Sequence, residues 1–153
     1  MKVIFLVLIF TLGTGFACAK DNNNCEAAKE VVEQFIALEL LGEGTHTSKQ
    51  LDKLIDYQDR DISGWDSLVL TNESKIISCK DSGNHVEVAV AHMVFGTISG
   101  NMSMEAISQL SSKFPSKEIN KLRLNKTSIG WKIDSPTVYS PHVSVAAAKK
   151  MLK

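Results

Sequence analysis

Apolar residues recur every three or four positions from Ala28 to Leu41, with charged residues on the other side of the repeat. This spacing predicts an amphipathic helix of about 17 residues. Asn23 stands before it with Glu26 three positions later, as in a capping box, and Gly42 follows its last turn. Because the helix has one apolar stripe, it must pack against another layer of the protein.

A second, shorter helix is expected after Gly44. Thr47 can cap it, with Gln50 three positions later, and apolar residues follow at helical spacing at Leu51, Leu54 and Ile55. This helix also has one apolar side, so both helices require a common partner surface.

The period changes to two in the middle of the chain. Residues 73–80 and 85–97 are predicted to be strands, joined by the turn sequence Asp81-Ser82-Gly83-Asn84. Both sides of the second strand are mostly apolar, so we expect a central strand covered on both faces. One face carries Val86, Val88, Val90, His92 and Val94, and the other carries Glu87, Ala89, Ala91, Met93 and Phe95.

The remainder of the chain completes an α+β domain that spans residues 20–153. Residues 104–110 fit either a helix or a strand. The predicted elements after them are a strand over 116–125, a turn over 125–128, a last strand over 129–134 and a C-terminal helix over 143–152, with its N-cap at Ser140-Pro141.

The first 19 residues have the pattern of a secretory signal peptide. Lys2 precedes an apolar run over residues 3–16, and Ala17-Cys18-Ala19 gives a small-x-small cleavage site before the polar residues from Lys20 onward. The run is shorter than the roughly 20 residues of a membrane span. We therefore expect cleavage after Ala19 and an exported, periplasmic or secreted protein. The alternative is a lipoprotein anchored by an acyl chain on Cys18.

Charge gives no sign of a nucleic-acid partner. The chain of 153 residues has 17 basic and 17 acidic residues, and loss of residues 1–19 removes one lysine and no acid. Proteins that bind nucleic acids carry an excess of basic residues, which this sequence lacks.

Two cysteines, Cys25 and Cys79, remain after the predicted cleavage site. In an oxidising compartment the simplest prediction for such a pair is a disulfide, and two buried free thiols are the alternative. No histidine or cysteine spacing matches a zinc site, so neither a metal nor another cofactor is predicted.

Several segments resemble the NTF2-like superfamily, also called cystatin-like or ketosteroid-isomerase-like. They are Val31-Val32-Glu33-Gln34-Phe35, Val86-Glu87-Val88-Ala89-Val90, Leu122-Arg123-Leu124 and Gly130-Trp131-Lys132-Ile133. The similarity covers roughly residues 25–135, and small secreted bacterial proteins of unknown function often share it. It implies N-terminal helices packed on a strongly curved antiparallel sheet, forming a cone with an apolar cavity. It also implies that a homodimer could form through the open sheet face. The C-terminal helix is an addition to the usual pattern.

Three residues are candidates for ligand binding. His92 lies on the valine face of the central strand, where a charge would be costly, so it is either a cavity residue or a neutral core histidine. Trp65 and Tyr57 fall in a segment that could form the rim of a pocket, whereas Trp131 is expected in the core. His46, His85 and His142 are expected to be exposed in turns or caps.

No catalytic motif is apparent, so the sequence favours binding over catalysis. The leading hypothesis is an exported, non-catalytic binding protein for a small apolar ligand or a protein partner. The alternatives are a periplasmic immunity or inhibitor protein against a secreted toxin, and a small-molecule isomerase or hydratase. The enzyme would require His92 to be buried beside an acid.

Overall fold

The computed structural model describes residues 22–46, 48–56, 67–99, 102–134 and 140–153. Its helices are α1 (Asn22–Leu40), α2 (Met104–Ser111) and α3 (Val145–Met151), with single 3₁₀ turns η1 (Glu43–Thr45) and η2 (Leu51–Lys53). Its strands are β1 (Ser67–Asp81), β2 (His85–Ser99), β3 (Ser116–Thr127), β4 (Gly130–Ile133) and β5 (His142–Ser144).

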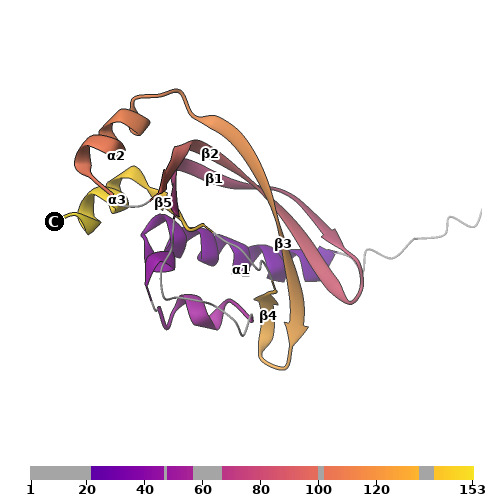
Figure 1. The fold of residues 1–153 in the computed structure, drawn as a ribbon. Helices are drawn as coiled ribbons and strands as arrows, with labels where there is room; N and C mark the ends of the chain where they lie inside the picture. The colour runs from indigo at the N-terminus through magenta and orange to yellow at the C-terminus, as the bar shows by residue number, and fades with distance from the viewer. Residues whose placement is uncertain (1–21, 47, 57–66, 100–101, 135–139) are drawn as a thin grey trace, which may run out of the picture.

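The strands form one curled sheet in the order β4-β3-β2-β1-β5 (Figure 1). β1 to β4 are antiparallel to their neighbours, and β5 returns from the C-terminal part of the chain to lie parallel to β1 at Val69–Thr71. The fold class is therefore α+β, as predicted, and the curl of the sheet fits a cone-like shape.

Irregularities in the long hairpin account for part of this curl. The β1–β2 register shifts at three places, between Leu70 and Thr71, between Thr71 and Glu73, and between Ile76 and Ser78. Each shift is a β-bulge, which bends the strand and increases its twist. The sheet consequently has a concave face and a convex face.

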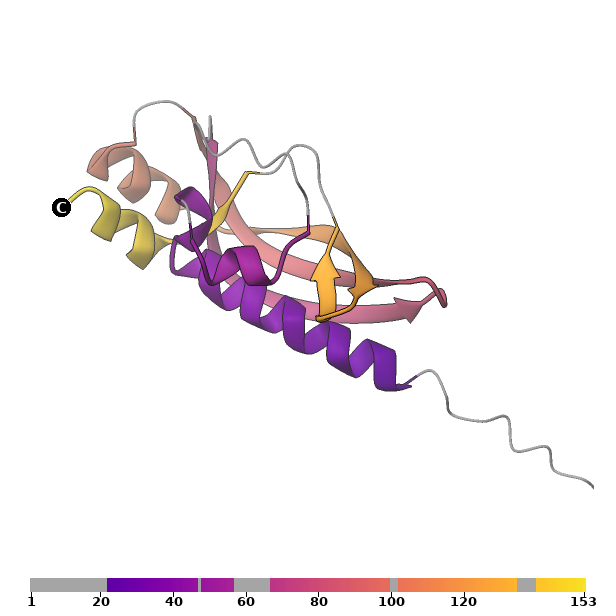
Figure 2. The same ribbon diagram turned by 90° about the horizontal axis from the view of Figure 1, so that it is seen from below.

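The concave face and α1 form the first hydrophobic core (Figure 2). α1 contributes Ala28, Val32 and Phe35, the positions that the helical repeat predicts to face inward. The sheet and the segment before it contribute Leu51, Ile55, Val86, Val88, Val90, Leu122, Leu124, Trp131 and Ile133. The predicted core position of Trp131 is confirmed, since its side chain is 9% exposed.

A second core lies at the other end of β1 and β2, where α2 and α3 pack on the sheet. It contains Leu68, Leu70, Ile98, Ile107, Val143 and Ala148. Leu70 and Val143 are register partners, and alternation places them on the opposite face of the sheet from Val69 and His142. The sheet is thus covered by α1 on one face and by α2 and α3 on the other.

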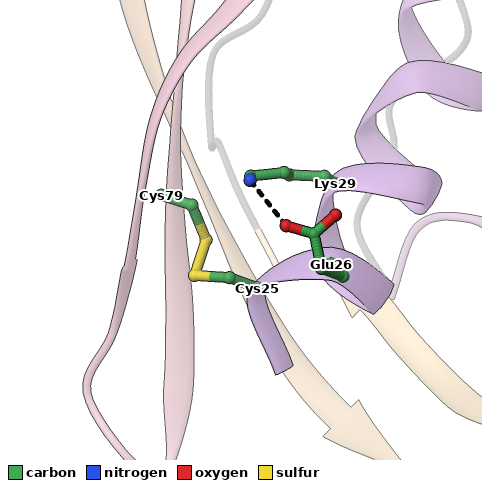
Figure 3. Close-up of polar contacts among 4 residues, drawn as sticks. All are labelled: Cys25, Glu26, Lys29 and Cys79. Carbon is green, nitrogen blue, oxygen red and sulfur yellow. Dashed lines mark hydrogen bonds and ion pairs between the residues drawn. A yellow bond between two sulfur atoms is a disulfide. The ribbon is translucent and has the colours of Figure 1, made fainter. Parts of the chain in front are cut away.

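The predicted disulfide between Cys25 and Cys79 is confirmed (Figure 3). It joins the first turn of α1 to the far end of β1, with a distance of 5.9 Å between the two Cα atoms. Beside it, Lys29 forms an ion pair with Glu26 at 2.9 Å. The bond closes a loop with a sequence separation of 54, which restricts the unfolded chain by about 4 kcal/mol in the entropic description.

Most predicted elements are present with altered bounds. β1 begins six residues before the predicted start at Glu73, and residues 104–110 are helical in α2. The capping box at Asn23 is wrong because α1 already begins at Asn22, whereas Gly42 ends the helix as predicted with φ +92°.

Two predicted helices are wrong in kind or extent. The helix expected after Gly44 is reduced to the turn η2, because the chain becomes extended at Ile55 to form a parallel bridge with Ile133. The C-terminal helix begins at Val145, capped by Ser144, since residues 142–144 are used as β5.

Several predictions lie outside the described residues. They are the signal peptide over residues 1–19, the alternative lipid anchor at Cys18 and the helix start at Thr47. The helix start at Ser140-Pro141 is described and is wrong, because these two residues precede β5. Within the described ranges, no helix is both long enough and apolar enough to span a bilayer.

Candidate functional site

Buried polar side chains gather where the first core ends. The described residues include five buried polar or charged ones: Glu39, Ser48, Thr71, His92 and His142. Of these, Thr71, His92 and His142 come from the three neighbouring strands β1, β2 and β5. Polar groups in such a position need partners from the protein or from a ligand.

His92 continues the face of β2 that carries Val86, Val88 and Val90, as predicted. Its side chain is 5% exposed, and its Nδ1 atom lies 2.8 Å from the Ser74 Oγ atom, with which it shares a hydrogen bond. Ser74 is also its register partner on β1. The strand pairing therefore holds the ring of His92 in one orientation.

His142 stacks on His92, with ring centroids 4.1 Å apart and 23° between the ring planes. The expectation that His142 is exposed is wrong, because only 4% of it is accessible. The reason is tertiary: His142 pairs with Val69 as the first residue of β5, which places it against the sheet. Two histidines 50 positions apart in sequence are thereby brought into contact.

Burial keeps both rings uncharged near neutral pH. It lowers the pKa of His92, and it lowers the pKa of His142 to about 3, with a smaller contribution from the neighbouring His92 ring. A neutral imidazole offers one N–H donor and one ring-nitrogen acceptor. The pair can therefore hydrogen-bond a neutral polar group but is a weak acceptor of protons.

Two further buried polar groups belong to the layer between α1 and the sheet. Thr71 is 0% exposed, and its Oγ1 atom has no hydrogen-bond partner in the structure. Glu39 is 2% exposed and occupies the last position of the inward stripe of α1, four residues after Phe35. The layer between α1 and the sheet thus changes from apolar to polar toward β5.

An acidic residue lies one strand away from His92. Glu118 on β3 is its register partner, so both side chains leave the sheet on the same face. Glu118 is exposed, however, and burial is the dominant influence on the pKa of His92. Glu118 is the acid that the strand register places opposite His92.

The structure does not test the other predicted ligand-binding residues. Tyr57 and Trp65 lie outside the described residues. The side chain of His46 is 60% exposed, as predicted. His85 is half-buried at the start of β2 and shares a hydrogen bond with Asn84.

Sequence reasoning missed His142, Thr71 and Glu39. A signal for Glu39 was present, because it continues the i, i+4, i+3 spacing of Ala28, Val32 and Phe35. No comparable signal existed for His142, whose burial depends on a strand of three residues.

In the described part of the chain, no three His, Cys, Asp or Glu side chains gather in a way that could hold a metal ion. Comparisons of the sequence with protein-family models and with curated proteins found no match.

Proposed function

We propose that this is an exported, non-catalytic binding protein of the NTF2-like type, which holds a small and largely apolar molecule against the concave face of its sheet. The observation that carries the proposal is the stacked pair His92–His142, buried at the point where the apolar core becomes polar. Ligand sites in proteins are typically apolar with a few fixed polar groups.

The chemistry of the pair indicates which ligand it would suit. Neutral imidazoles and the unpartnered Thr71 Oγ1 can serve a carbonyl, hydroxyl or ether group without a charge. A charged ligand would be opposed by the same burial that lowers the two histidine pKa values. Export is supported by the Cys25–Cys79 disulfide, since such bonds persist in oxidising compartments.

Native mass spectrometry of the protein purified from its own host tests this proposal. We expect a small neutral adduct, and we expect the neutral apolar fluorophore Nile red to compete with it. His142→Phe retains the stacking area but removes the hydrogen-bonding atoms, so it should lose most of the adduct while remaining folded. His85→Phe, which makes the same change at the far end of β2, is the matched control and should retain the adduct.

Two outcomes would contradict the proposal. One is a bare protein that does not bind Nile red, and the other is an adduct retained equally by His142→Phe and the wild type. A polypeptide retained in place of a small adduct would favour the inhibitor hypothesis.

An isomerase or hydratase is the second candidate, favoured only by the register of His92 and Glu118. Proton transfer between substrate carbons would be expected to exchange substrate hydrogen with solvent deuterium. An adduct that acquires deuterium in the wild type, but not in Glu118→Gln, would establish the enzyme over the binding protein.

A further inference from the structure

One edge of β1 is free over most of its length. β5 pairs with this edge only at Val69–Thr71, and none of the other described strands pairs with it over residues 72–81. An unpaired edge presents a row of backbone donors and acceptors that can add another strand.

The space beside this edge is open. Two adjoining grooves of about 480 and 470 Å³ run between the flank of α1 and β1, and both are lined by Glu33 and Ile76. Ile77, at the centre of the free edge, is 47% exposed. The disulfide at one end of the groove fixes α1 and β1 relative to one another.

We propose that this edge pairs with the same edge of a second copy, antiparallel and around a two-fold axis, to form a homodimer. In the register that we infer, Glu73 lies opposite Lys80 of the second copy and Lys75 opposite its Ser78. Ile76 lies opposite Ile76 of the second copy at the two-fold axis, and the bulged Ile77 is left out of the ladder. A two-fold interface must be self-complementary, and residues 72–81 meet that condition.

The charges favour this register. Glu73 and Lys80 give two oppositely charged cross-strand pairs in the dimer, one on each side of the axis. Lys75 already contacts Glu73 at 2.7 Å within one copy, so each Glu73 would lie between two lysines. Lysines and bulges on an edge strand normally prevent its pairing with other chains. Here the Lys80 charge is compensated by Glu73 of a second copy.

The bulge at Ile77 allows residues that lie opposite one another in the two copies to share one face of the sheet. Side chains alternate along a strand, and one extra residue shifts the alternation beyond it. Glu73 and Lys75 before the bulge consequently share a face with Ser78 and Lys80 after it. The nine residues of 72–81 other than Ile77 would form about nine backbone hydrogen bonds, within the range of stable interfaces.

Isotope-mixed cross-linking tests the register directly. Equal amounts of unlabelled and ¹⁵N-labelled full-length chain, with the disulfide intact, are mixed and treated with a carbodiimide that joins adjacent carboxylate and ammonium groups. We expect a Glu73–Lys80 cross-link that combines one labelled and one unlabelled peptide. Within one copy these side chains are roughly 23 Å apart along the strand, too far for this reagent.

Charge reversal tests the same contact by analytical ultracentrifugation. Glu73→Lys places like charges opposite one another twice, so we expect the dimer dissociation constant to rise roughly tenfold or more at low salt. The double variant Glu73→Lys/Lys80→Glu should restore it. Glu118→Lys, on β3 and away from the edge, is the matched control and should leave association unchanged.

Circular dichroism of each variant establishes that it is folded. The proposal is overturned if the wild type is monomeric at its highest soluble concentration. It is also overturned if a dimer forms without the mixed cross-link, or if the double variant fails to recover association although it is folded. A dimer through the open sheet face, which the family resemblance implies, would form without the mixed cross-link, and Glu73→Lys would leave its association unchanged.

Discussion

The two stacked histidines make the stability of the protein depend on pH. Both side chains are at most 5% exposed. Protonation would therefore place a positive charge where water cannot solvate it. In an unfolded chain a histidine has a pKa of about 6.5. Folding therefore lowers the proton affinity of this pair, and proton binding in turn favours the unfolded state.

The resulting pH dependence has a definite sign. The pKa of His142 is about 3 in the folded protein, so the unfolded chain binds more protons between about pH 6.5 and 3. The contribution of neutral His142 to the free energy of unfolding is fully present above pH 6.5. It should fall by about 1.4 kcal/mol for each pH unit below that. Urea denaturation at a series of pH values measures this slope.

One substitution separates His142 from the other titrating groups. His142→Phe should make the slope shallower by about the contribution of one histidine. Equal slopes in the wild type and His142→Phe would show that His142 takes up a proton without unfolding.

At the scale of elements, α1 and β2 could be predicted because their signals are local. The inward stripe at Ala28, Val32 and Phe35 and the alternation of Val86, Val88 and Val90 each follow from the sequence and give the first core. The same alternation placed His92 on the buried face, so one half of the candidate site was predictable.

The other half was not, since β5 has no local signal. Ser140-Pro141 is typical of a helix start, and the alanines that follow favour a helix. Pairing with Val69–Thr71 outweighs that preference for residues 142–144, so the helix begins only at Val145, with Ser144 as its N-cap. The burial of His142 depends on the pairing of these three residues with β1, so only the assembled sheet shows that His142 is buried.

The end of α1 gives a prediction at the same scale. Gly42 has φ +92°, donates its N–H to the Glu39 carbonyl at 2.7 Å and lies against the methyl group of Met151 in α3. Gly42→Ala should cost about 1–2 kcal/mol of unfolding free energy, the strain of a left-handed alanine. Met151 should add little, because it is 37% exposed and the end of its flexible side chain can move aside.

Gly83→Ala is the matched control for this strain. Gly83 has φ +83°, and an added Cβ would meet no atom within 4 Å. Similar losses of urea stability in the two variants would confirm that the backbone alone matters. A much larger loss in Gly42→Ala would mean that α3 is locked against the end of α1.

At the scale of the whole molecule, the sheet joins two cores that lie on its opposite faces. The first is held by α1 and the Cys25–Cys79 disulfide, and the second by α2 and α3. The polar group of His92, His142 and Thr71 lies at the same end of β1 as the second core but on the other face. The histidine pair therefore depends on β5, and β5 is continuous with α3.

This arrangement predicts that the two cores differ in local stability. Leu124 in the first core and Ile107 in the second are both 0% exposed, so alanine at either position should cost about 2–5 kcal/mol. Ile107→Ala should accelerate amide hydrogen exchange in α2, α3 and residues 67–71 of β1. The amides of Val86, Val88 and Val90 should remain protected, since α1 and the disulfide still cover that end.

Leu124→Ala should instead accelerate exchange at those three valines. Equal acceleration throughout the described strands in both variants would show that the two cores open as one cooperative unit.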